Sequence, residues 1–269
     1  MIIDGGFMAS NWRNGAKWNR EETILALELY CRTSFGKITQ SNQDIIDLAQ
    51  LLGRTPGSVG LKMHNLAHHD PELIKKNISA MAHGSKLDKQ IFEEFNNNWT
   101  ELSFEAHRIK AMMKGIDLEE QVASQGIEIP PIGTTREQLI KARIGQYFFR
   151  MSVLNAYGNR CCITGLNKSE LLVASHIKPW AISDEITERT NPRNGLCLNS
   201  LHDKAFDRGL ITIDFNYNII LSQSIKSAKM DQNTKDWFMR YDRKRIELPD
   251  KFLPKKDFIE YHNDVIFLK

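Results

Sequence analysis

Residues 170–211 decide the fold of the second half of the chain: ELLVASHIKPW (residues 170–180), a charged loop, and then NPRNGLCLNSLHDKAFDRGLI (residues 191–211). The apolar runs ELLVASHI and NGLCL predict two short strands, and SLHDKAFDRG predicts a helix that ends at Gly209. A further hairpin is expected over residues 210–221. Two strands followed by a helix bring His176, Asn194 and His202 together.

The segment before this stretch has a helical pattern. Apolar residues recur at helical spacing over residues 136–157, and CCITG (residues 161–165) predicts a turn in which Gly165 can take a positive φ. The spacing then changes to that of strands. We therefore expect an α+β fold, with a helical N-terminal domain followed by a C-terminal domain of two strands and a helix.

Three short helices are predicted near the start of the chain, over residues 18–33, from about residue 42 to residue 52, and from Thr55 onward. Gly53 ends the second helix, and Thr55 followed by Pro56 begins the third. This is the outline of a helix-turn-helix unit, whose third helix would carry Lys62 into a DNA groove. A small three-helix bundle used for packing or dimerisation remains an alternative, because this half of the chain is net acidic.

Further helices are expected over residues 86–114. The helical pattern lapses after residue 115, and GIEIPPIGTT (residues 126–135) is rich in turn-forming residues. We expect a helical accessory domain over residues 1–115, a linker over residues 116–135 and the chemically active domain over residues 136–269.

Composition limits the class of protein. The chain has 269 residues, 41% hydrophobic and 26% charged, which is typical of a globular protein, and no apolar run is long enough to cross a membrane. No basic stretch followed by an apolar one is visible at the start, so we expect a cytoplasmic protein. The four cysteines are expected as thiols, and no C-x-x-C pair favours structural zinc. The net charge is +3, with the basic excess in residues 141–269.

These segments resemble the HNH endonucleases, whose catalytic unit is a β-hairpin and a helix around one metal ion (the ββα-metal fold). The resemblance covers about residues 141–269 and lies in GQYFFRMSVLNAYGNRCCITG, ASHIKPW, NPRNGLCLNSLHDKAFDRGLI and DWFMRYDRKRIELP, in the order of the restriction-like branch. The helical segments WNREETILALELY and GRTPGSVGLKMHN are similar to an accessory domain that precedes such units in bacterial proteins.

Phosphodiester hydrolysis needs an activated water, charge stabilisation and help for the leaving oxygen. His176 suits the first task, because an imidazole with a pKa of about 6.5 is largely neutral near pH 7. His202, near the first turn of the following helix, would present a nitrogen to a divalent cation at the same phosphate. Asn194 resembles the middle Asn of the family, which ties the loop together and orients the base. It is also a common turn residue before a glycine.

The metal site departs from the family pattern at one position. Many HNH enzymes have Asp, Glu or His immediately before the base histidine, and this chain has Ser175 there. The ion would then rely on His202 and water, with Asp203 or Asn199 as further ligands. Mg²⁺ is the expected ion, and an imidazole ligand leaves Mn²⁺ and Ni²⁺ as alternatives.

Basic side chains near the predicted site are candidates for binding DNA phosphates. We expect this role for Lys178, Arg193 and Lys204, and for Lys62 in the N-terminal helices, although each can equally be a surface charge. Asp207, at the end of the predicted helix, is expected to cap it or to form a salt bridge.

The sequence therefore predicts a metal-dependent HNH DNA endonuclease that cuts double-stranded DNA. The resemblance implies 5′-phosphate and 3′-hydroxyl ends and a role in bacterial restriction or defence. Cutting both strands with one site per chain favours a homodimer. The alternative is a DNA-binding regulatory protein in which the helical domain binds DNA and the HNH fold is an inactive scaffold.

Overall fold

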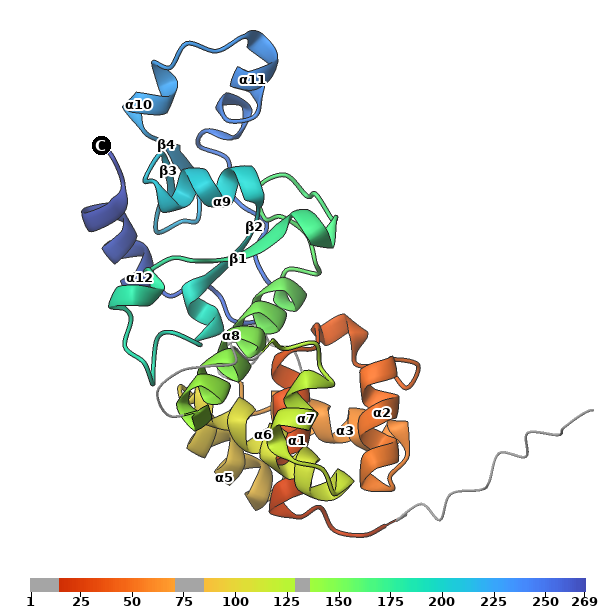
Figure 1. Cartoon of the computed structure of the whole chain (residues 1–269). Helices are drawn as coiled ribbons and strands as arrows, with labels where there is room; N and C mark the ends of the chain where they lie inside the picture. Colours follow the sequence, from red (N-terminus) through yellow and green to blue (C-terminus); the bar gives the residue numbers. More distant parts are fainter. Residues whose placement is uncertain (1–14, 71–84, 129–135) are drawn as a thin grey trace, which may run out of the picture.

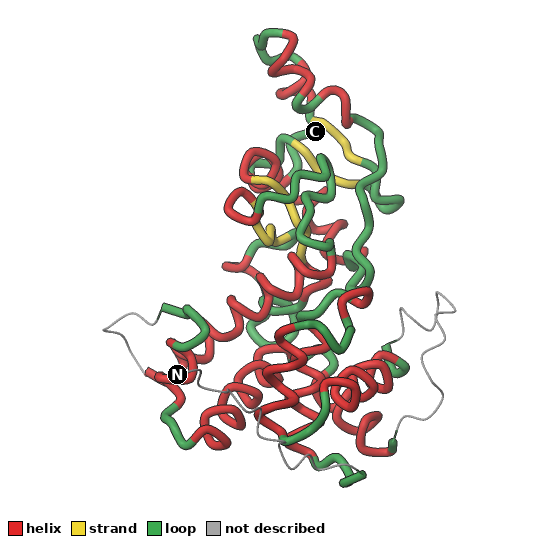
Figure 2. The backbone as a smooth tube through the Cα atoms, turned by 90° about the vertical axis from the view of Figure 1, so that its right-hand side faces the viewer, coloured by secondary structure: helices red, strands yellow, loops and turns green. Residues whose placement is uncertain are grey.

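The computed structural model of the chain describes residues 15–70, 85–128 and 136–269, and its architecture is α+β, as predicted. Helices α1, α2, α3, α5, α6 and α7 gather at one end of the molecule, and α8 leads from them to the end that holds the strands (Figure 1). Viewed from the side, the strands are confined to that second end (Figure 2). None of the described helices is long and apolar enough to span a membrane.

The N-terminal helices begin and end close to the predicted positions. Asn19 caps the first helix, Gly53 adopts a left-handed conformation with φ 61° at the end of the second, and the Thr55 side chain accepts a hydrogen bond at the start of the third. The bounds of these helices are α1 (Arg20–Cys31), α2 (Gln43–Leu52) and α3 (Pro56–Ala67). Helix α1 is buried at the centre, with all its residues from 22 to 31 covered.

Helices α5 (Lys86–Phe95), α6 (Trp99–Lys114) and α7 (Leu118–Ala123) complete this end of the molecule. Helix α7 lies within the segment that the sequence predicted as a linker, and Asp117 caps it. Val122 and the nearby Ile127 are buried in a cluster with Phe104 of α6 and Ile140 of the next helix. This part of the segment is therefore packed, because two spaced apolar residues find partners that a turn-rich sequence does not reveal.

Helix α8 (Arg136–Ala156) belongs to two apolar cores. Phe148 packs in the N-terminal core and stacks on Trp99, with 6.3 Å between ring centroids. Phe149 and Val153 pack in the C-terminal core. Neighbouring positions on one helix thus hold the two ends of the molecule together.

The C-terminal end contains the predicted strands and helix. Strands β1 (Leu172–His176) and β2 (Gly195–Asn199) are antiparallel, and α9 (Ser200–Asp207) follows β2 directly. A second hairpin has strands β3 (Ile211–Ile213) and β4 (Ile219–Leu221). The remaining helices are short: α10 (Gln223–Lys226), α11 (Gln232–Asp236) and α12 (Lys256–Tyr261).

The cysteines are thiols and are buried. Cys161 and Cys162 pack in the C-terminal core with Cys197 of β2, and Cys31 packs in the N-terminal core. Burial raises the pKa of Cys162 and Cys31, which keeps both thiols protonated.

Candidate active site

A pocket of about 530 Å³ lies between the end of β1, the loop that follows it, and one face of α9. Residues 173–176 of β1 line one side, together with Pro179 and Trp180 of the following loop. Four residues of α9 and its C-terminal cap form the other wall: Asp203, Lys204, Asp207 and Arg208. Asp207 lies one helical turn after Asp203, and Arg208 lies one turn after Lys204. The pocket therefore joins an imidazole, two carboxylates and two cations.

His176 occupies the last position of β1, where its ring is held on three sides. Phe149 of α8 stacks on the imidazole, with 3.9 Å between ring centroids and an interplanar angle of 12°, and Trp180 meets its edge at 5.6 Å. Nε2 of His176 lies 2.9 Å from the backbone oxygen of Arg189. The side chain is thus fixed by its own loop and by α8.

This hydrogen bond sets the tautomer of His176. A carbonyl oxygen only accepts, so Nε2 carries the proton and Nδ1 keeps its lone pair. Within the described residues, Nδ1 has no hydrogen-bond partner. Burial lowers the pKa of His176 from its ordinary value of 6.5, against the opposing effect of the Arg189 carbonyl. The ring is therefore a neutral proton acceptor at neutral pH.

Gly195 makes the stacking of Phe149 on His176 geometrically feasible. It pairs with His176 across the hairpin, directly under α8. A Cβ at this position would lie 2.4 Å from Cγ2 of Val153 and 3.0 Å from Cζ of Phe149. Only a residue without a side chain lets the helix approach the strands this closely.

Asn194, fully buried, ties the loop after β1 to the start of β2. Its Oδ1 accepts a hydrogen bond from the Lys178 backbone N–H at 2.8 Å, and its Nδ2 donates to the Lys178 oxygen at 3.0 Å. Both ends of the amide therefore bind the segment immediately after His176. The catalytic role predicted for Asn194 stays a prediction, and the contacts make it a residue that positions the loop.

The two carboxylates of the α9 wall lie near each other. Partial burial and the charge of Asp203 raise the pKa of Asp207. Ser175 lines the same pocket, is 2% exposed, and its hydroxyl oxygen has no hydrogen-bond partner among the described residues. Two negative groups and an unpartnered hydroxyl form a set of oxygen donors that suits a hard divalent cation.

His202 faces a different part of the molecule. Its Nδ1 is 2.9 Å from Nδ2 of Asn199, and its Nε2 is 2.9 Å from the backbone oxygen of Trp237. The ring lines a separate pocket with Thr164 and Tyr241. His202 shares the buried face of α9 with residues 205 and 206, whereas Asp203 and Asp207 are on the pocket face. The expectation that the His176 and His202 rings meet at one phosphate is therefore not met in this structure.

The predicted phosphate-binding cations are placed in different environments. Lys178 forms an ion pair with Glu188, and Arg193 lies 3.9 Å from Asp70 of the N-terminal part. Lys62 is buried against Asp88. The one of the four predicted cations that lines the pocket is Lys204, and it is exposed there.

Sequence reasoning gave Asp207 only a capping or salt-bridge role, and it named Arg208 as one of several basic side chains that could contact phosphates. Both lie on the pocket wall, and the signal that identifies them is their spacing, because residues four apart on a helix share a face. Arg150 of α8 also supports the site, since both its terminal nitrogens donate to the Leu172 oxygen at 3.1 Å and fix the start of β1.

The donor atoms of the pocket determine which metal ion it could hold. Within the described residues, no group of three or more His, Cys, Asp or Glu side chains is placed to hold a metal ion. Two carboxylates and a hydroxyl suit a cation that keeps most of its water ligands and is also coordinated by phosphate oxygens of the substrate, as Mg²⁺ usually is. The residues present therefore fit a weakly held Mg²⁺ better than a tightly bound zinc ion.

Comparison with known protein families gives a match in the region that contains this site. Residues 161–214, which contain β1, β2, α9 and β3, match the family model described as HNH endonuclease. No curated protein matched the chain. The match confirms the resemblance of this region to the HNH endonucleases.

Proposed function

We propose that the HNH endonuclease domain formed around residues 161–214 is a metal-dependent phosphodiester hydrolase that cuts double-stranded DNA. The observation that carries the proposal is the shared pocket of His176, Asp203 and Asp207. It supports the proposal because a neutral imidazole with an open Nδ1 shares one pocket with two carboxylates. This is the pairing that direct attack by water on a phosphodiester requires.

In the proposed mechanism His176 is the general base. Nδ1 accepts a proton from the attacking water, and the imidazolium that forms keeps its Nε2–H bond to the Arg189 oxygen. Asn194 holds the loop that carries this carbonyl, so the base does not rotate as it gains charge. Trp180 covers the ring edge and limits its hydration.

Asp203, Asp207 and Ser175 would hold the divalent cation. When bound, the cation supplies neutralisation of charge on the non-bridging and leaving oxygens of the phosphate. Because the donors are oxygens, we propose Mg²⁺, with Mn²⁺ as a substitute, and Ni²⁺ loses the support that an imidazole ligand would give. His202 would act indirectly, by fixing α9 through its bonds to Asn199 and Trp237.

The exposed cations Lys204 and Arg208 would contact the backbone phosphates on either side of the cut. We propose 5′-phosphate and 3′-hydroxyl products, and a role in restriction or defence, on the strength of the family resemblance. Cutting of both strands by a chain with one such pocket supports a homodimer.

The alternative of a DNA-binding regulator loses support at α3. Lys62, the cation expected to enter a groove, is 4% exposed, and its amine is paired with Asp88 and lies 4.8 Å from the Trp18 ring centroid. A side chain held in this way does not reach a phosphate. Helix α3 is therefore better explained as part of a packed bundle.

The test is cleavage of supercoiled plasmid by the full chain with Mg²⁺ or Mn²⁺. Wild type is expected to nick and linearise the plasmid, and His176→Ala to lose this activity while remaining folded at the assay temperature. His68→Ala, a half-buried histidine of the N-terminal helices, is the matched control and should cleave normally. Gel retardation of DNA by a wild-type protein that never nicks it would establish the regulator instead.

A further inference from the structure

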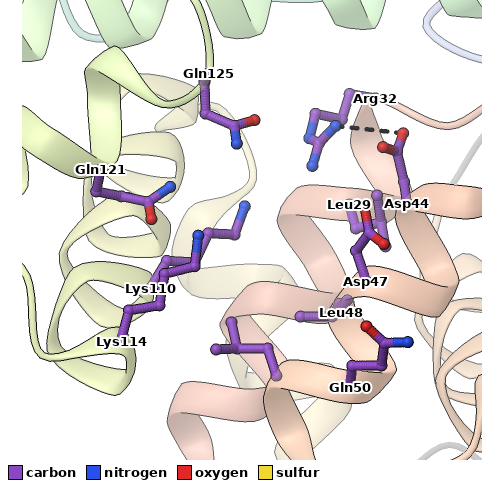
Figure 3. Close-up of a pocket in the computed structure, with 11 residues that line it drawn as sticks. Leu29, Arg32, Asp44, Asp47, Leu48, Gln50, Lys110, Lys114, Gln121 and Gln125 are labelled. Atoms are coloured by element: carbon purple, nitrogen blue, oxygen red, sulfur yellow. Dashed lines mark ion pairs between the residues drawn. The ribbon is translucent and has the colours of Figure 1, made fainter. Parts of the chain in front are cut away.

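A second pocket lies in the N-terminal end, far from the hairpin in the chain. Its volume is about 390 Å³, and it opens between α1, α2, α6 and the end of α7. In Figure 3 the side chains of Lys110, Lys114 and Gln121 extend from one wall toward Asp44 and Asp47 on the other. This volume is within the range of small-molecule sites.

Gln121 is the feature that points to a ligand. The residue is fully buried, and neither Oε1 nor Nε2 has a hydrogen-bond partner among the described residues. Burying an amide without partners costs about 1–3 kcal/mol for each unsatisfied group, so such positions are rare in native proteins. A ligand that offers one donor and one acceptor side by side would satisfy both atoms at once.

Three basic side chains line this pocket, and two of them, Arg32 and Lys110, are paired with carboxylates. Glu28, buried beneath the pocket, binds Arg32 at 2.6 Å and Lys110 at 3.0 Å. Burial alone would raise the pKa of Glu28, but Arg32 and Lys110 lower it to about 2, so it is ionised. Arg32 also lies 3.6 Å from Asp44 on the opposite wall. Lys114, one turn beyond Lys110, has no ion pair within the described residues and is exposed at the rim. An anionic group at this wall would be favoured.

The rest of the lining is apolar or acidic. Leu29, Leu48 and Leu51 contribute hydrocarbon surface between the two charged walls. Asp44 and Asp47 lie on the wall opposite the lysines. Asp44 pairs with Arg32 and Asp47 accepts a hydrogen bond from Gln43, and each carboxylate has further lone pairs for amino or hydroxyl groups. A ligand that fits must have a flat apolar body, an edge with adjacent donor and acceptor, further donors, and an anionic group at one end.

We propose that this pocket binds a nucleotide. A glutamine amide pairs bidentately with the edge of a base such as adenine, and apolar side chains cover the faces of bases that are taken out of a stack. The base would lie against Gln121 and the leucines, the phosphate against Lys110 and Lys114, and amino or hydroxyl groups against Asp44 and Asp47. The nucleotide is either free in solution or part of a DNA strand, and the chemistry of recognition is the same.

This proposal is independent of the proposed nuclease activity, because none of the residues that line the pocket of His176, Asp203 and Asp207 contributes to nucleotide binding. Binding is therefore measured by calorimetry without divalent metal, on the full chain, with each of the four common mononucleotides, with adenosine, and with a short single-stranded oligonucleotide. Gln121→Leu removes only unsatisfied polar atoms, so it should fold at least as well as wild type. Lys114→Ala tests the phosphate end, and Gln90→Leu on the exposed face of α5 is the matched control.

We expect at least one mononucleotide to bind roughly tenfold more weakly to Gln121→Leu than to wild type, because the variant loses two hydrogen bonds. The same mononucleotide should bind to Gln90→Leu as tightly as to wild type. Lys114→Ala should weaken binding of the mononucleotide but not binding of adenosine, which has no phosphate. Binding of the oligonucleotide alone, with the same dependence on Gln121, supports the proposal and assigns the nucleotide to a DNA strand. Absence of binding by every probe, or binding that none of the pocket variants alters, overturns it, whatever the cleavage assay shows.

Discussion

Gly195→Ala tests the link between packing and chemistry at the base histidine. The added Cβ would lie 2.4 Å from Cγ2 of Val153, closer than carbon atoms approach without displacement. It would also lie 3.0 Å from Cζ of Phe149, the ring that stacks on His176 at 3.9 Å. Either α8 moves away from the hairpin or Phe149 changes position, and both changes disturb the base.

The magnitude follows from overpacking of a tight core. A methyl group forced into such a space costs about 1–3 kcal/mol of unfolding free energy. The cleavage rate should fall further than this loss of stability explains, because a displacement of about 1 Å at a catalytic group can cost roughly 100-fold in rate. We therefore expect a protein that is still folded at 25 °C but has a greatly reduced rate of plasmid nicking.

The assay pairs urea unfolding with plasmid nicking on three variants. Gly36→Ala is the matched control, since a Cβ there meets no atom within 4 Å, and it should leave stability and rate nearly unchanged. Adding Val153→Ala to Gly195→Ala removes the closest contact and should recover part of the rate. Wild-type stability and wild-type nicking by Gly195→Ala would refute the reasoning.

The remaining predictions concern charge. Burial lowers the pKa of His176 below 6.5, and the neutral form is the active base, so the nicking rate should stay high as pH falls through 6.5 and drop only below it, which a pH–rate profile measures. Asp203→Asn and Asp207→Asn should each raise the Mg²⁺ concentration for half-maximal nicking by roughly tenfold or more. The control Asp257→Asn changes an exposed residue of α12 and should leave this concentration unchanged. Unchanged values for both pocket variants would contradict the metal assignment. Lys62→Ala leaves its buried carboxylate partner unpaired, so it should lower the free energy of unfolding by about 3–5 kcal/mol without altering nicking by the folded protein, measured by urea titration and plasmid assay.

Much of the fold follows from local signals in the sequence. Gly53 and Gly209 both have a positive φ where they end helices, at 61° and 68°, and Thr55 caps α3 as its sequence predicts. The strands and α9 lie where their apolar spacing predicts them. Helix α7 was missed because residues 118–123 are too few for a period to be recognised, and only contacts with α6 and α8 stabilise them.

The candidate site was less predictable because it depends on directions across elements. The sequence pattern predicts His176 at the end of a strand, and Asn194 before Gly195 indicates the loop that precedes the second strand. The stacking of Phe149 on the base needs the close approach of α8 to β2, which no local pattern reveals. Likewise, the unsatisfied amide of Gln121 becomes visible only when α7 is packed.

His202 shows how a single residue step on a helix changes a role. Each step on an α-helix turns the side chain by about 100°, and here His202 lines the pocket with Thr164 and Tyr241 whereas Asp203 lines the pocket of His176. The buried residues His202, Ala205 and Phe206 mark the core face of α9, which leaves Asp203 and Asp207 for the opening. The helical spacing of the apolar residues thus contained the signal that assigns the pocket to the carboxylates. On this reasoning an imidazole that packs in the core sets the position of α9, and the carboxylates on the other face are the ligands that we propose for the cation.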